Sequence, residues 1–239
     1  MDILALANTK GGVGKTTLAL HLGVEAECAG RRVVWVDLDP QASLTEAWEA
    51  RAAATPALAE VLAMGEPPGE RRARRLGEEL GTKLASLAAE GYDLAVLDTP
   101  PEHYQAVHLD AGLAAATVIL VPIQPTPLAL RAVGPLLAKL SPERRFAFVV
   151  NEASPNRFVQ STPQAIAELS AHGRVAPVIL HRRELYATAT ADGRTAGEIA
   201  PSHAAAREVR NLWLFVESWI NERTEPSERR PTERRKART

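Results

Sequence analysis

The sequence predicts an α/β protein with a doubly wound, mostly parallel sheet that carries helices on both faces. Three observations support this. Short apolar runs alternate with longer helical stretches, several runs are apolar at nearly every position, and a glycine-rich turn joins the first run to the first helix. The 239 residues are 46% hydrophobic and 24% charged, which is typical of a globular protein with one large core.

Six strands are predicted in order, over residues 2–7, 32–37, 93–98, 117–122, 145–151 and 176–180. Helices are predicted between them, the strongest over residues 16–29, 69–90 and 202–222, and weaker ones over 103–113, 128–140 and 160–172. Gly30 and Gly91 follow the first two strong helices, where glycine commonly ends a helix. The alternation indicates βα units joined into one sheet.

Charge is unevenly distributed along the chain. The formal net charge is −1, but residues 223–239 carry seven basic and three acidic side chains. This segment lacks large apolar residues, so we expect a disordered basic tail that either touches nucleic acid or only aids solubility. Residues 1–222 are expected to form the folded domain. No long apolar span or secretory signal is evident, so a cytoplasmic protein without membrane attachment is expected.

The most informative motif is Lys10–Thr17, which reads KGGVGKTT between the first strand and the first helix. Such a turn directs backbone N–H groups and the positive end of a helix dipole at one point, where a phosphate binds. Lys15 is expected to reach the β- and γ-phosphates, and Thr16 to hold Mg²⁺. Thr9 stands where the usual motif has its first glycine, and a second lysine, Lys10, follows it. The motif predicts a P-loop of an unusual type for a nucleoside triphosphate.

Acidic and amide side chains follow three other strands. Asp37 and Asp39 come at the end of the second strand, and Asp98 ends the third strand in the form of a Walker B site. Asn151 closes the fifth strand, and its amide can both donate to and accept from an adenine edge. Because ligands bind at the carboxyl ends of parallel strands, we expect these side chains to lie near the P-loop. Asp98 would fix Mg²⁺ between the phosphates.

Taken together, these motifs give the chain a family resemblance over most of its length. With Lys10–Thr17, Asp37–Gln41, Asp98–Pro101 and Asn151, it resembles the ParA/MinD group of deviant Walker A ATPases. Among them it is most similar to the short ParA-type (ParF-like) partition ATPases without an N-terminal helix-turn-helix domain, because its P-loop begins within ten residues of Met1. The stretches 121–128 and 182–198 add weaker similarity.

The resemblance implies ATP and Mg²⁺ as ligands and a homodimer when ATP is bound. In such a dimer Lys10 of each protomer crosses to the partner's phosphates, Asp39 positions the attacking water, and Asn151 reads adenine. The residues so assigned are Lys10, Lys15 and Asp39 for catalysis, Lys10, Gly11, Gly12, Val13, Gly14, Lys15, Thr16, Thr17 and Asn151 for ATP, and Thr16, Asp37 and Asp98 for the metal.

The resemblance further implies that the ATP dimer binds DNA nonspecifically, and that a ParB-like partner on the cargo stimulates hydrolysis and releases the dimer. Where larger relatives carry a basic string before the last helix, residues 199–206 contain no arginine. The candidate DNA contacts are Arg182, Arg183, Arg194, Arg207 and Arg210. We therefore expect a nucleoid-associated ATPase that partitions plasmid or chromosome DNA.

Other functions compete with this interpretation. A related ATPase that positions a protein cargo, such as a chemoreceptor cluster or a microcompartment, is barely separable by sequence. A MinD-like membrane switch needs a terminal amphipathic helix, which the tail lacks. A metabolic P-loop enzyme, such as a synthetase or a reductase component, is disfavoured for two reasons. The single Cys28 cannot ligate an iron–sulfur cluster even across a dimer, and no substrate-binding insertion is evident.

Overall fold

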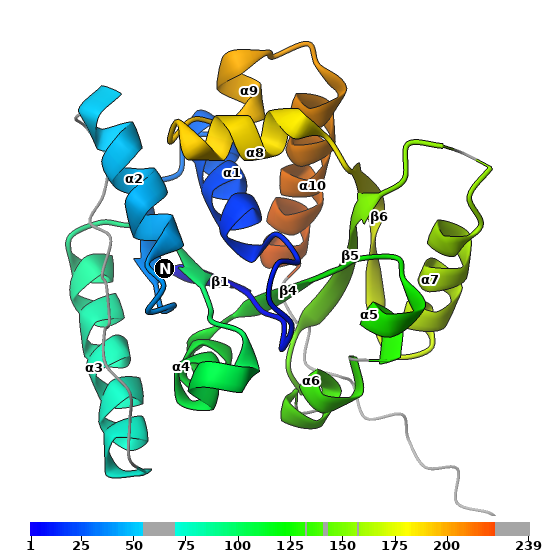
Figure 1. Ribbon diagram of the computed structural model, residues 1–239. Helices are drawn as coiled ribbons and strands as arrows, with labels where there is room; N and C mark the ends of the chain where they lie inside the picture. The colour runs from blue at the N-terminus through cyan, green and yellow to red at the C-terminus, as the bar shows by residue number, and fades with distance from the viewer. Residues whose placement is uncertain (55–69, 132, 141–142, 157, 223–239) are drawn as a thin grey trace, which may run out of the picture.

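The computed structural model describes residues 1–54, 70–131, 133–140, 143–156 and 158–222 (Figure 1). The tail predicted over residues 223–239 lies outside this part of the chain. Six strands form one sheet in the order β2-β3-β1-β4-β5-β6, and all neighbouring pairs are parallel. The strands are β1 Asp2–Leu6, β2 Val33–Asp37, β3 Leu94–Asp98, β4 Val118–Ile123, β5 Phe146–Ala153 and β6 Arg174–His181. The predicted doubly wound parallel sheet is confirmed.

The helices differ from the prediction in four places. The segments α2, α8 and α9 were not predicted, and the single helix predicted over residues 128–140 is described as α5 and α6. The helices are α1 Lys15–Cys28, α2 Ser43–Ala54, α3 Glu70–Ala89, α4 Glu102–Ala115, α5 Pro127–Arg131, α6 Val133–Lys139, α7 Ser161–Ser170, α8 Glu184–Ala191, α9 Ala196–Ile199 and α10 Ala204–Asn221.

Two hydrophobic cores cover the two faces of the sheet. One core joins alternate strand residues to leucines of α3 and α4, such as Leu80 and Leu109, and to residues of α5, α6 and α7. The other joins the remaining strand residues to α1, α2 and α10, including Leu20 and Trp213. Figure 1 shows α1 and α10 on one side of the sheet and α4 and α6 on the other. The strands are apolar throughout because both of their faces are buried.

Close packing fixes α1 on the sheet. The indole of Trp35 in β2 is fully buried, and its Nε1 donates to the carbonyl of Ala19 at 2.9 Å. A Cβ at Gly23 would lie 2.3 Å from this indole, so only glycine permits such an approach. The helix that begins at the glycine-rich turn is therefore held against the sheet.

Strand β1 occupies the centre of the sheet, between β3 and β4. Chain connections diverge to the two halves of the sheet from here, and ligands bind at the carboxyl ends of strands beside such a point. The glycine-rich turn leaves the carboxyl end of β1, so the topology places it at the expected site. Among the described residues, no helix combines the length and apolar character needed to cross a membrane.

Candidate active site

The phosphate loop, residues 9–17, has the backbone of an anion cradle. Gly12 and Gly14 adopt positive φ of 68° and 87°, a region that disfavours residues with a Cβ. Gly14 is the N-cap of α1 and makes no side-chain capping hydrogen bond, so it does not satisfy the first N–H groups of the helix. A Cβ on Gly14 would lie 2.4 Å from the Asn151 amide nitrogen. The loop therefore fits a phosphate group held by backbone N–H donors.

Lys15 supplies a buried cation at this loop. Its side chain belongs to the first turn of α1, and its Nζ donates to the carbonyl of Lys10 at 3.4 Å. Burial lowers the pKa of Lys15, while the negative charges of Asp98 and Asp39 raise it. Because these two acids act on Lys15 directly, residues of three strand ends converge at the loop, as the sequence predicted.

Asp98 and Thr16 form the centre of the predicted metal site. The hydroxyl of Thr16 donates to Asp98 Oδ2 at 2.5 Å, which leaves the hydroxyl oxygen able to bind a cation. Asp98 Oδ1 is buried and has no hydrogen-bond partner among the described residues. Burial raises the pKa of Asp98 to about 7, against the lowering effect of the Thr16 hydrogen bond.

An unpartnered carboxylate oxygen in the interior is costly, and a hydrated divalent cation would remove that cost. Mg²⁺ prefers oxygen ligands of this kind. The donor set of Thr16 and Asp98 therefore fits Mg²⁺, which would neutralise charge on a bound triphosphate.

Asp37 lies beside Asp98 because β2 and β3 pair at these two positions. Its carboxylate is already engaged: Oδ2 accepts from the N–H and hydroxyl of Thr45 at 2.9 Å, and Oδ1 accepts from the N–H of Asp39 at 3.0 Å. Burial raises the pKa of Asp37, whereas the Thr45 hydrogen bonds lower it. Asp37 thus caps the start of α2, and its role beside the metal stays a prediction.

Lys10 lies at the rim of the loop and is held there by a residue after β4. Its Nζ donates to Gln124 Oε1 at 3.3 Å, and Gln124 Nε2 donates to the carbonyl of Gly12 at 3.1 Å. The backbone N–H of Lys10 donates to Asn8 Oδ1, and Asn8 Nδ2 donates to the carbonyl of Pro122. The carboxyl end of β4 therefore braces the loop at Lys10.

Beside the loop lies a cavity of about 350 Å³ between α1, β5 and the start of α8, which we call the β6–α8 cavity. It is lined by Gly14, Thr17, Leu18, Asn151, Glu152, His181, Arg182, Arg183, Glu184, Tyr186 and Ala187. Asn151 is buried, and its Nδ2 donates to the carbonyl of Val13 at 2.8 Å. The amide nitrogen therefore braces the loop, and the reading of adenine by Asn151 stays a prediction.

Comparison with known proteins agrees with this geometry. The family model described as "CobQ/CobB/MinD/ParA nucleotide binding domain" matches residues 4–196. The chain belongs to this family. It is 33% identical over 256 positions to the chromosome-partitioning ATPase Soj of Thermus thermophilus, covering 92% of this chain and 96% of Soj.

Two further proteins are similar to this chain over most of their length. The maintenance of carboxysome distribution protein A of Halothiobacillus neapolitanus is 26% identical over 221 positions, covering 87% of this chain and 93% of that protein. The cobyrinic acid a,c-diamide synthase of Mycobacterium smegmatis, solved with an ATP analogue and magnesium, shares the fold. Its TM-score is 0.70 at 22% identity, covering 95% of this chain and 98% of that one. The family match and the similarity to Soj thus make the protein a ParA-type P-loop ATPase.

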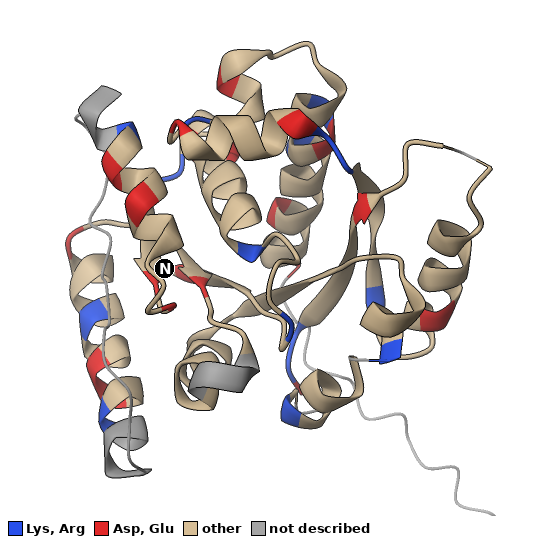
Figure 2. Ribbon diagram, in the orientation of Figure 1, with Lys and Arg blue, Asp and Glu red and all other residues tan. Residues whose placement is uncertain are grey.

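The arginines proposed as DNA contacts of this ParA-type ATPase belong to the segment from the end of β6 to α10. Figure 2 shows Lys or Arg positions, in blue, where β6 leads into α8 and on α10. Within the described residues, four of them pair with carboxylates: Arg182 with Glu152, Arg183 with Glu208, Arg194 with Asp192 and Arg210 with Glu25. Arg207 donates to the carbonyl of Ser202. These five arginines share one stretch of the chain, and their DNA contacts remain a prediction.

Sequence reasoning missed several residues of the site. It noted the stretch 121–128 without assigning Gln124. Among the cavity-lining residues 181–187 it assigned only Arg182 and Arg183, as DNA contacts. Gln124 stands one residue after β4, next to β1, so the rule that ligands bind at strand ends could have identified it. Tyr186 and Glu208 had no such signal, because they meet only through the packing of α8 on α10.

Proposed function

We propose that this protein forms an ATP-dependent homodimer, binds DNA nonspecifically and partitions plasmid or chromosome DNA on the nucleoid. A ParB-like partner carried by the cargo would stimulate hydrolysis. The observation that carries the proposal is the similarity to Soj, a chromosome-partitioning ATPase, over nearly the whole of both chains. Residues 1–222 would be the ATPase domain, and residues 223–239 a basic tail.

The placement of Lys10 supports the dimer. Lys15 already serves the phosphate loop of its own protomer, while Lys10 lies at the rim with its ammonium on Gln124. A cation on a second protomer can stabilise the charge that develops on a transferred phosphoryl group. ATP binding and dimerisation would then be linked, because each ATP site would be completed by Lys10 of the second protomer.

We place the triphosphate on residues 10–17 and the nucleoside in the β6–α8 cavity, with Asn151 against the base. Gly14 and Thr17 line this cavity and also belong to the phosphate loop, so one nucleotide can span both. Asp39 would hold the attacking water, since it lies near Lys15 and Asp98.

The substitution Lys10→Ala tests the dimer. We expect it to leave ATP binding to the monomer within about two-fold and to abolish the dimer that the parent forms with a non-hydrolysable analogue. Size-exclusion chromatography with light scattering measures both states. The control is Lys139→Ala, which removes a lysine that pairs with Asp110 away from the loop. A Lys10→Ala dimer as stable as that of the parent would contradict the proposal.

The substitution Asp39→Ala separates binding from hydrolysis. We expect turnover to fall by about 100-fold, the effect of losing a residue that orients the nucleophile, while the ATP dimer persists for longer. Phosphate release and dimer lifetime are the measurements. The control is Asp110→Ala, an acid of α4 that pairs with Lys139. A monomeric Asp39→Ala protein in ATP would show that the assignment is wrong.

Binding to random duplex DNA tests the remaining part. We expect binding with ATP and much weaker binding with ADP, with a steep loss of affinity as salt rises. Arg207→Ala with Arg210→Ala should weaken binding and reduce the salt slope, whereas Arg75→Ala, an exposed arginine of α3, should not. Equal binding in ATP and ADP would exclude the DNA role.

A protein cargo is the second candidate, favoured by the similarity to a carboxysome distribution protein over most of both chains. The two functions share the ATPase cycle and differ in the partner. Capture of the stimulating partner on the ATP-bound Asp39→Ala protein distinguishes them, because a DNA-binding partner would indicate partition and a cargo-shell partner would indicate positioning.

A further inference from the structure

One carboxylate makes hydrogen bonds with several polar residues that line the β6–α8 cavity. Glu208 of α10 accepts from the N–H of His181 at 3.2 Å and lies 2.9 Å from His181 Nδ1. It also accepts from Arg183 Nη2 at 2.6 Å and from the Tyr186 hydroxyl at 3.1 Å. Three side chains that line the cavity are thus bound to a residue that does not line it.

This cluster is partly shielded from solvent. The side chains of Glu208 and Arg183 are 14% and 23% exposed. Burial raises the pKa of Glu208, but the hydrogen bonds from Arg183 and His181 outweigh it and leave the pKa below its usual range. Glu208 is therefore an ionised carboxylate whose position is fixed by its partners, and it fixes theirs in return.

The cavity wall is also attached to α1. The ring of Tyr186 packs edge-on against the imidazole of His21, with centroids 5.4 Å apart. His21 Nε2 accepts from the N–H of Ala196 at 3.1 Å, so Nδ1 carries the proton and donates to the carbonyl of Thr17 at 2.8 Å. Tyr186 is therefore held by a hydrogen bond to Glu208 of α10 and by a ring contact with His21 of α1, the helix that begins at the phosphate loop.

We propose that Glu208 is a positioning residue for nucleotide binding: through Arg183, Tyr186 and His181 it holds the cavity wall at the spacing that the base and ribose of ATP require. The residue touches no part of the nucleotide itself. The inference rests on the placement of the nucleoside in the β6–α8 cavity given above.

The position of Glu208 permits a selective test. A residue that acts on the nucleoside alone should change affinity for ATP without changing affinity for a bare triphosphate, which binds only the phosphate loop. Loss of folding would reduce both affinities. Calorimetric titration with Mg²⁺-ATP and with Mg²⁺-tripolyphosphate therefore separates a positioning role from a merely structural one.

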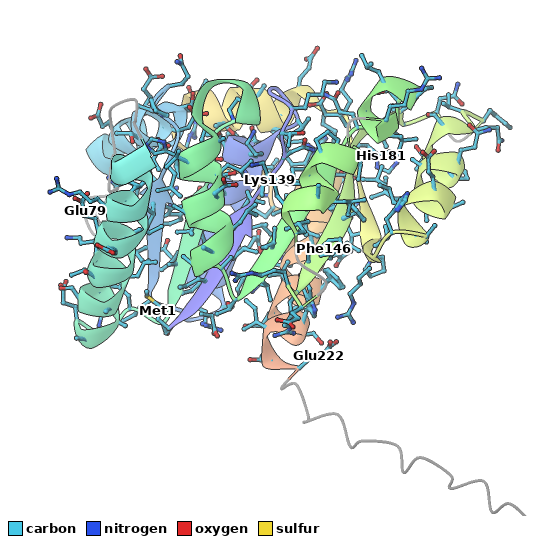
Figure 3. The ribbon with its side chains drawn as sticks, turned by 90° about the horizontal axis from the view of Figure 1, so that it is seen from below. Met1, Glu79, Lys139, Phe146, His181 and Glu222 are labelled. Atoms are coloured by element: carbon cyan, nitrogen blue, oxygen red, sulfur yellow. The ribbon has the colours of Figure 1, made fainter. Side chains whose placement is uncertain are left out.

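Glu208→Gln keeps the shape of the side chain and removes its charge. We expect about 10-fold weaker binding of ATP and unchanged binding of tripolyphosphate, because Arg183 and Tyr186 lose a charged acceptor. The matched control is Glu222→Gln, which breaks an Arg–Glu pair of similar geometry, with Arg174, just beyond the other end of α10. Figure 3 shows His181 and Glu222 far apart, with Glu222 at the lower end of the ribbon. The control should change neither affinity.

A second variant keeps the test independent of Glu208 itself. Arg183→Gln should also weaken ATP binding. The double variant should bind no more weakly than Glu208→Gln alone, because the positioning of Arg183 depends on its pair with Glu208. Equal ATP affinity in Glu208→Gln and the parent would overturn the inference while leaving the cavity assignment intact. A parent protein that binds ATP no more tightly than tripolyphosphate would overturn the cavity assignment, and the inference with it.

Discussion

The two ends of the nucleotide site are built differently. At the phosphate end, backbone N–H groups and short side chains stand directly at strand ends, as with Thr16 on Asp98. At the nucleoside end, the wall of the β6–α8 cavity consists of longer side chains held by residues from other helices, as with Tyr186 on Glu208 and His21. The first end depends on local chain geometry, and the second on how distant elements pack.

The largest expected effect lies at the phosphate end. Lys15→Ala should weaken Mg²⁺-ATP and Mg²⁺-tripolyphosphate alike by about 100-fold, because a charged hydrogen-bond donor is lost from the group that both ligands share. Calorimetric titration measures both ligands, and thermal unfolding verifies the fold. Loss of ATP binding with tripolyphosphate binding retained would show that the two ends are not separate as described.

A smaller effect concerns His21, which connects the two ends. Burial lowers its pKa to about 4, so the folded protein keeps it neutral while the unfolded chain takes up a proton near pH 6.5. The histidine's contribution therefore makes the folded state less stable as pH falls from 7 toward 4. Between pH 7 and pH 5 we expect the parent to lose about 2 kcal/mol more of its unfolding free energy than His21→Leu does.

Urea unfolding at the two pH values gives this difference. The other titrating groups, including the neighbouring Glu198, are common to both proteins and largely cancel. The same pH dependence in parent and variant would mean that the imidazole is not held neutral between Thr17 and Ala196.

The smallest expected effect lies at the nucleoside end. Tyr186→Phe removes a hydroxyl that donates to Glu208 and lies 3.0 Å from the carbonyl of Ala205, and it keeps the ring on His21. We expect ATP binding to weaken by about 3-fold, as for the loss of one neutral donor, with tripolyphosphate unaffected. An effect as large as that of Lys15→Ala would show that the ring itself has moved.

The comparison also explains what the sequence could predict. The phosphate loop was found because its residues are contiguous and their spacing is set by backbone contacts with phosphate. Asp39 and Asp98 were found because parallel strands end at one edge of the sheet. Glu208 was missed because it meets His181 from 27 residues away, on a helix face that only packing selects.

The unpredicted helix α2 has a similar cause. The N–H of Thr45, near its start, is bound by Asp37, eight residues earlier. The cap therefore comes from outside the local sequence window in which helix signals are sought. The assignment of Asp37 to the metal alone overlooked this contact.

The contact between Gly23 and Trp35 has a mechanical consequence. With no space between the helix and the indole, α1 has no room to shift toward the sheet when a nucleotide arrives or leaves. We therefore expect α1 to keep its position on the sheet through the ATPase cycle. We expect the displacements between ATP-bound and ADP-bound protein to occur in elements outside this contact, and first in the chain from β6 to α8. These displacements can be measured after superposition on α1.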